Sequence, residues 1–148
     1  MAKSHTITIS YAAGTIPPWS YTIVPNQADP KKAKIKRGDD LNWVSQQGAW
    51  TVFFKGTTPL VDSAGIGIAS LGAAGGVSAG GTVSKKPKVG ATFTYGVSLL
   101  LPGTTGPVTD DPEIIIESDG AVKKKKKAPA KPKSKPKARA KPKPKKKK

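Results

Sequence analysis

The side chains that most often carry out chemistry are scarce in this chain of 148 residues. There is no cysteine, and His5 is the one histidine. A His/Cys zinc cluster and a serine triad with an imidazole base both need more than the sequence supplies. A single histidine is far more often a surface or capping residue than a catalyst. We therefore expect that role for His5 and predict that the protein is not an enzyme.

The acidic residues form two clusters, Asp39-Asp40 and Asp110-Asp111 with Glu113. Neither has the spaced oxygen ligands and the glycine of a calcium loop. We interpret both as turn residues, with Asp39 and Asp40 also balancing the basic residues just before them. The sequence predicts no metal site and no cofactor.

The residues that could bind a partner lie at 123–148, a run of lysine, proline and alanine without an acid. Of the 26 Lys and Arg residues in the chain, sixteen are in this run, which leaves ten against nine Asp and Glu for residues 1–122. The predicted nucleic-acid-binding residues are Lys123, Lys124, Lys125, Lys126, Lys127, Lys131, Lys133, Lys135, Lys137, Arg139, Lys141, Lys143, Lys145, Lys146, Lys147 and Lys148. Flexible lysines contact phosphates as point charges and read no base edge.

A segment of like charge with no side chain suited to a core cannot offset its ordering entropy. Residues 121–148 are therefore predicted to be a disordered polycationic tail, and residues 1–120 a single domain. A secondary basic patch is predicted at Lys31, Lys32, Lys34, Lys36 and Arg37. We expect it to bind weakly, because Asp39 and Asp40 lie beside it and partly cancel its field.

Alternation of apolar and polar residues predicts strands at 5–11, 19–24, 41–44, 50–54, 91–100 and 113–117. A short edge strand is predicted at 31–37 with Ile35 inward, and a further edge at 82–88. Residues 41–44 and 50–54 are predicted to pair around the turn at 46–48. Residues 65–81, with seven glycines, fit a flexible loop or a small-residue strand. No helical periodicity is present, so the predicted fold is all-β, an antiparallel β-sandwich.

The order of these pieces resembles the cupredoxin-like fold, with an immunoglobulin-like sandwich as the alternative. The resemblance rests on Gly38-Asp39 leading into Leu41-Asn42-Trp43, on residues 50–54, on residues 90–95 and on a closing strand at 114–116. Where that family has its first copper-binding His and its Cys, this chain has Trp50 and Val97. The resemblance thus implies the fold without the copper site.

The three tryptophans, Trp19, Trp43 and Trp50, could stack on single-stranded bases. Their alternation with polar neighbours favours core packing instead.

The Ala-Lys-Pro-Lys and Lys-Pro-Lys repeats of the tail resemble the tails of linker histones and of lysine-rich nucleoid proteins. That resemblance implies sequence-independent contact with phosphates. We therefore predict a non-enzymatic nucleic-acid-associated protein, with the sandwich as a spacer or as a module that binds a protein partner. The location expected for it is the cytoplasm, with the nucleoid as one candidate place.

The alternative is a tether to an anionic membrane or a cell-envelope polymer through the same tail. An apolar or lipid anchor would normally accompany such a basic run, and none is visible. The residues before the first strand contain no apolar h-region, so no signal peptide is expected, and no transmembrane segment is predicted. The sequence leaves open the oligomeric state and the choice between DNA, RNA and another polyanion.

Overall fold

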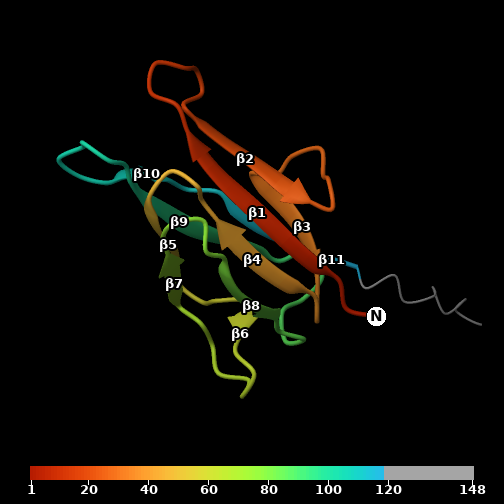
Figure 1. Cartoon of the computed structure of the whole chain (residues 1–148). Helices are drawn as coiled ribbons and strands as arrows, with labels where there is room; N and C mark the ends of the chain where they lie inside the picture. Colours follow the sequence, from red (N-terminus) through yellow and green to blue (C-terminus); the bar gives the residue numbers. More distant parts are fainter. Residues whose placement is uncertain (119–148) are drawn as a thin grey trace, which may run out of the picture.

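Strands account for all the regular structure in residues 1–118, the part of the chain that the computed structural model describes (Figure 1). The predicted all-β class is confirmed. The prediction of a disordered tail falls at 121–148, outside the described residues.

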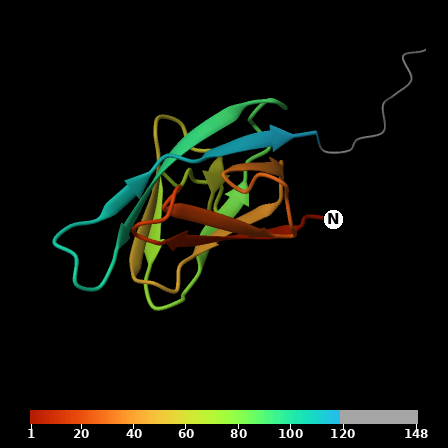
Figure 2. The ribbon, with the colours of Figure 1, turned by 90° about the horizontal axis from the view of Figure 1, so that it is seen from above.

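Two sheets face each other, as Figures 1 and 2 show. The first sheet runs in the order β2 (Trp19–Val24), β1 (Ser4–Tyr11), β4 (Asp40–Val44), β8 (Ala79–Val83) and β6 (Leu60–Val61). The second runs in the order β3 (Lys32–Lys36), β11 (Glu113–Glu117), β9 (Thr92–Leu100), β5 (Ala49–Phe54) and β7 (Ser70–Ala73), with β10 (Val108–Asp110) also paired to β9.

Both sheets are mixed, whereas the sequence led us to expect antiparallel pairing throughout. Strand β1 pairs with β4 in parallel, and β3 pairs with β11 in parallel. The other strand pairs are antiparallel. Alternation along one strand reports which face is buried and carries no information on the direction of its neighbour.

The predicted pairing of residues 41–44 with 50–54 is wrong, because β4 and β5 belong to different sheets. Each buries its apolar face against the other sheet: Trp43 is fully buried on β4, and Val52 is fully buried on β5. Residues 45–48 join β4 in the first sheet to β5 in the second. Gly48 is needed there, because a Cβ at this position would collide with the carbonyl of Leu100. A hairpin and a crossover have the same alternation, so the pattern alone could not separate them.

One hydrophobic core fills the space between the sheets. Its fully or almost fully buried members are Ile7, Ile9, Tyr21, Ile23, Ala33, Ile35, Leu41, Trp43, Trp50, Val52, Phe54, Leu60, Val83, Tyr95, Val97, Leu99, Ile114 and Ile116. The inward faces predicted for most strands are therefore confirmed. Strand β3 buries two residues, Ala33 as well as Ile35. Trp43 and Trp50 pack in the core as predicted, whereas Trp19 is half-buried and stacks on Tyr21.

The glycine-rich segment 65–81 contains ordered strand at both ends of a turn, β7 and the start of β8. Of the flexible loop and the small-residue strand that the sequence allowed, the strand is confirmed for residues 70–73 and 79–81. Gly80 is required because a Cβ there would meet the carbonyl of Leu41. The further edge predicted at 82–88 is reduced to the end of β8, and residues 84–88 form no strand. Strands β6 and β10 were not predicted, since two or three residues carry too little alternation to read.

Candidate functional site

The structure divides the predicted secondary basic patch among three places. Lys31 forms an ion pair with Asp110, with 3.0 Å between Nζ and Oδ2. Lys32, Lys34 and Lys36 lie on the outward side of β3, because Ala33 and Ile35 take the inward positions. Arg37 follows the strand and lines an adjoining hollow with Met1 and Lys85, which Lys36 and Asp39 also border. The sixteen basic residues predicted at 123–148 lie outside the described part of the chain.

The three outward lysines of β3 border a cleft of about 440 Å³ at one end of the sandwich. It lies between the start of β1, the loop that joins β2 to β3, and the outer side of β3. The residues that line it are Lys3, His5, Pro25, Asn26, Gln27, Ala28, Asp29, Lys32, Lys34, Lys36, Asp39 and Glu117.

Asp39 lies at the base of this cleft and is only 4% exposed. One carboxylate oxygen accepts a hydrogen bond from the backbone N–H of Lys3, and the other is 2.9 Å from Nε2 of His5. Gly38, with φ of +86°, makes the turn that brings Asp39 to the start of β4, beside β1. Asp39 thus closes the turn at residues 36–39, in line with the prediction, and its carboxylate is buried with both oxygens hydrogen-bonded.

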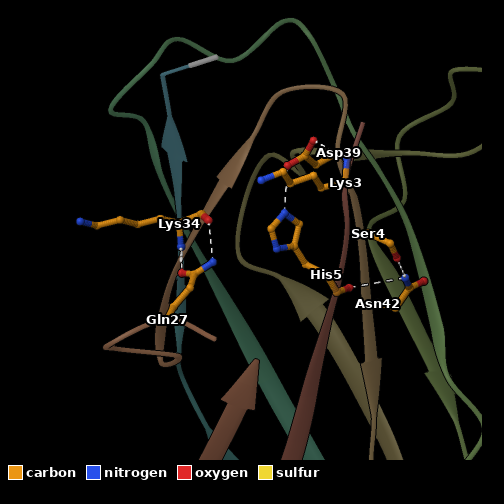
Figure 3. A network of polar contacts seen from close by, with 7 residues as sticks. All are labelled: Lys3, Ser4, His5, Gln27, Lys34, Asp39 and Asn42. Atoms are coloured by element: carbon orange, nitrogen blue, oxygen red, sulfur yellow. Dashed lines mark hydrogen bonds and ion pairs between the residues drawn. The ribbon is translucent and has the colours of Figure 1, made fainter. Parts of the chain in front are cut away.

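His5 is also buried, which corrects the prediction of a surface or capping role. The imidazole is 7% exposed and projects from β1 toward the side on which Gln27 and Lys34 lie (Figure 3). A carboxylate can only accept, so Nε2 carries the proton that is shared with Asp39. Nδ1 is buried and has no hydrogen-bond partner among residues 1–118.

Gln27 closes the outer edge of β3 next to the cleft. Its amide nitrogen donates to the carbonyl of Lys34 at 2.8 Å, and its amide oxygen accepts from the N–H of Lys34 at 2.7 Å (Figure 3). The N–H of Lys32 donates to the carbonyl of Asp29 on the same edge. An open strand edge invites pairing with another chain, and here the loop before the strand occupies it.

The balance of charge in the cleft is more positive than the sequence suggested. Asp40 points elsewhere, accepting a hydrogen bond from Thr82 at 2.7 Å, and does not line the cleft. Asp39 lines it, but both its oxygens already have donors. Four lysines thus face two exposed acids, Asp29 and Glu117.

Chemically, this set of residues suits binding better than catalysis. Lysines supply mobile positive charge, and Gln27 and Asn26 supply amides. The lining contains no Ser, Thr, Tyr or Cys. The cleft therefore offers no hydroxyl or thiol for the His5–Asp39 pair to activate.

The two positions that the cupredoxin-like resemblance would assign to copper ligands lie in the core. Trp50 is 2% exposed on β5, and Val97 is fully buried on β9. Within residues 1–118, no three His, Cys, Asp or Glu side chains come together in a way that could hold a metal ion.

A second polar cluster, next to the start of β3, involves Tyr21. Its hydroxyl donates to Asp110 at 2.8 Å, and Lys31 pairs with the same carboxylate. Burial, followed by the hydrogen bond to Asp110, raises the pKa of Tyr21 well above its ordinary value. Asp110 is thus a structural partner of β2 and β3.

Sequence reasoning missed Lys3, Gln27 and the His5–Asp39 pair as parts of one site. Asp39 lies 36 residues from Lys3 and 34 from His5 along the chain, and it meets them because β1 and β4 run in parallel. The one local signal was Gly38-Asp39 before an alternating segment, which indicated a turn and nothing more.

In the described part of the chain, no helix is long and apolar enough to cross a membrane. No family model matches this sequence, and no curated protein is significantly similar to it.

Proposed function

We propose that this is a non-enzymatic nucleic-acid-associated protein whose basic C-terminal segment binds phosphate backbones without sequence specificity. The observation that carries the proposal is the partition of charge along the chain. Sixteen basic residues and no acid occupy 123–148, while residues 1–122 are nearly neutral. Such an excess binds dense polyanions through the release of condensed counterions.

The residues that line the cleft of the sandwich also support this proposal. One cleft of the sandwich is lined by four lysines and by no Ser, Thr, Tyr or Cys, a composition that favours anion binding. We propose that the sandwich serves as a spacer or binds a protein partner. The cupredoxin-like relationship and the linker-histone-like character of the tail remain parts of the same proposal, as does a cytoplasmic or nucleoid location.

Fluorescence anisotropy on random duplex DNA, across a salt series, tests the proposal. With 6 to 10 phosphates engaged, the affinity should fall by about 10³ to 10⁵ between roughly 50 and 200 mM salt. Scrambling the DNA sequence should leave the dissociation constant unchanged. A chain ending at residue 120 should lose most of the binding, and its circular dichroism should stay that of a β protein, because the core lies within residues 7–116.

Anionic vesicles and duplex RNA of equal charge are the competing partners in the same assay. If vesicles bind more tightly than duplex at every salt concentration, the tether is the better description and the nucleic-acid proposal fails. Unchanged DNA affinity after removal of residues 121–148 would contradict both.

A further inference from the structure

We propose that the cleft beside β3 is a binding site for a small phosphate-bearing ligand, and that it works independently of the basic C-terminal segment. The first observation is its size: about 440 Å³ falls within the range of pockets that hold small ligands, roughly 300 to 1,000 Å³. This inference does not rest on the proposed function, because its residues all lie in the sandwich.

The second observation is how the cationic groups are arranged. Lys32, Lys34 and Lys36 alternate along one strand, so their stems leave β3 on the same side. Lys3 precedes β1, and its side chain reaches over the imidazole of His5 (Figure 3). Within residues 1–118, the four ammonium groups form no ion pair. Cations from two sheets therefore converge on one hollow with their charge available to a ligand.

The third observation is that Asp39, at the base of the cleft, is held by hydrogen bonds within the protein. The carboxylate of Asp39 is the acid closest to the imidazole, and its two oxygens are held at 2.9 Å by Lys3 N–H and His5 Nε2. Both of its oxygens are therefore already engaged by donors of the protein. The pair also fixes the backbone of Lys3, the residue before β1, against Asp39, so one wall of the cleft is held in place before a ligand arrives.

The fourth observation concerns the ring itself. His5 is 93% buried, and Nδ1 has no partner among the described residues. Nδ1 is sealed from solvent, so we assign the direct contacts with phosphate oxygens to the lysines and the amide of Asn26. The imidazole lies directly behind them and will sense the charge of a bound anion.

The ligand class follows from these groups. Lysines are point-charge donors that suit the several oxygens of a phosphate, and no Phe, Tyr or Trp lines the cleft to stack on a base, while the ring of His5 is buried. A terminal phosphate or pyrophosphate group is therefore the recognised part. It could belong to free phosphate or to the end of a nucleotide.

NMR on the full-length protein tests the site without interference from the rest of the chain. His5 is the one histidine of the sequence, so its imidazole proton signals need no assignment and report the cleft alone. Titration with inorganic pyrophosphate at constant pH should shift these signals along a saturating curve. A parallel titration with 5′-phosphorylated dithymidylate separates the sources: tighter binding indicates a nucleotide end, and equal binding indicates phosphate alone.

The matched variants are Lys32→Ala/Lys34→Ala/Lys36→Ala and Lys85→Ala/Lys86→Ala/Lys88→Ala, which remove the same charge from the cleft and from an exposed loop outside it. The first should weaken pyrophosphate binding, as followed by the His5 signals, about tenfold, since each exposed ionic contact contributes roughly 0.2 to 1 kcal/mol. The second should change it less than about twofold, because none of its three lysines lines the cleft and exposed charges are screened by salt.

Two results would overturn the proposal. One is a His5 signal that does not move at millimolar pyrophosphate, and the other is equal weakening in both triple variants, which would indicate general charge attraction only. Since all lysines involved are exposed or half-exposed, the variants should fold, and retained dispersion of the amide spectrum checks this. Anisotropy on duplex DNA reads out the C-terminal segment separately, so either proposal can fail alone.

Discussion

Two buried regions of the sandwich are held together by opposite kinds of interaction. At the centre, Trp43 packs edge-on against Tyr95, with 5.4 Å between ring centroids, and against Phe54 at 6.3 Å. At the cleft end, Asp39 is held by hydrogen bonds from His5 and Lys3. Within residues 1–118, the buried indole N–H of Trp43 and hydroxyl of Tyr95 make no hydrogen bond of good geometry, although Trp43 interacts with that hydroxyl closely enough to lower its pKa, whereas both oxygens of Asp39 are paired.

The difference indicates which region sets stability and which sets local order. The centre gains its free energy from apolar area, enough to outweigh polar atoms that are left unpaired. The cleft end contributes few apolar contacts, and its hydrogen bonds mainly fix the positions of Lys3 and His5. Changes at the centre should therefore unfold the protein, while changes at the cleft end should alter the site at a smaller cost in stability.

Trp43→Ala should give the largest effect, a loss of about 3 to 5 kcal/mol in the free energy of unfolding. Trp43 is fully buried, and its removal leaves a cavity against Tyr95 and Phe54. Urea denaturation followed by circular dichroism measures the change. Trp19→Ala is the control, since Trp19 is half-buried and should cost clearly less. Equal losses in the two variants would contradict the importance of the centre.

High pH should weaken the centre next. Burial raises the pKa of Tyr95 above its ordinary value of 10.0, so the folded protein keeps a proton that the unfolded chain releases. The unfolded state then binds fewer protons, and the stability that is present below about pH 10 falls as the pH rises further. Above pH 10, Tyr95 should contribute about 1.4 kcal/mol per pH unit, and Tyr21, whose pKa is also raised by burial and by its hydrogen bond to Asp110, adds to the loss.

Guanidinium denaturation at about pH 8 and pH 11 measures this loss. Tyr95→Phe has no proton to release, so its stability should fall less between the two conditions, and lysine titration cancels in the comparison. Phenolate absorbance should also show tyrosines that ionise only on unfolding. A pH dependence that is identical in the two proteins would show that Tyr95 is not the cause.

The centre could be predicted from the sequence and the cleft end could not, for a physical reason. Burial of Trp43, Val52 and Phe54 follows from alternation along single strands, a local property. The His5–Asp39 pair and the Gln27 contact depend on which strands are neighbours and in which direction they run. The sequence carries no local signal for the parallel pairing of β1 with β4, so His5 was predicted to lie at the surface.

Asp39→Ala should cost about 1.5 to 3 kcal/mol, the range for hydrogen bonds to a charged group. The substitution leaves the N–H of Lys3 and Nε2 of His5 without their acceptor in a buried place. Asp39→Asn should cost less, because the amide oxygen can still accept from Lys3 and the other histidine tautomer can accept from the amide nitrogen.

Asp40→Asn is the matched control for Asp39, one residue along the same strand. Asp40 is exposed and accepts from Thr82 at the surface, so the change should stay within about 0.5 kcal/mol. Thermal melting compares the three variants, and the imidazole signals of His5 should move in the Asp39 variants alone. If Asp40→Asn destabilises as much as Asp39→Ala, the buried pair is not what orders this end.

Gln27→Ala should cost less than Asp39→Ala, about 1 kcal/mol, because its two hydrogen bonds to Lys34 lie at an exposed edge. The substitution uncovers the backbone of β3, so amide exchange at Lys34 should become faster than exchange in the core strands.

Gln27→Glu sharpens the test: it keeps an acceptor for the N–H of Lys34 but places an oxygen against the Lys34 carbonyl. It should therefore speed exchange of the same amide less than Gln27→Ala does, while melting at a similar temperature. Size-exclusion chromatography at rising concentration should show whether the uncovered edge pairs between chains, which the lysines of β3 are expected to resist. If the amide of Lys34 exchanges as fast in the unaltered protein as in Gln27→Ala, the Gln27 contact does not close this edge. The centre and the cleft end would then differ only in how much apolar surface each buries.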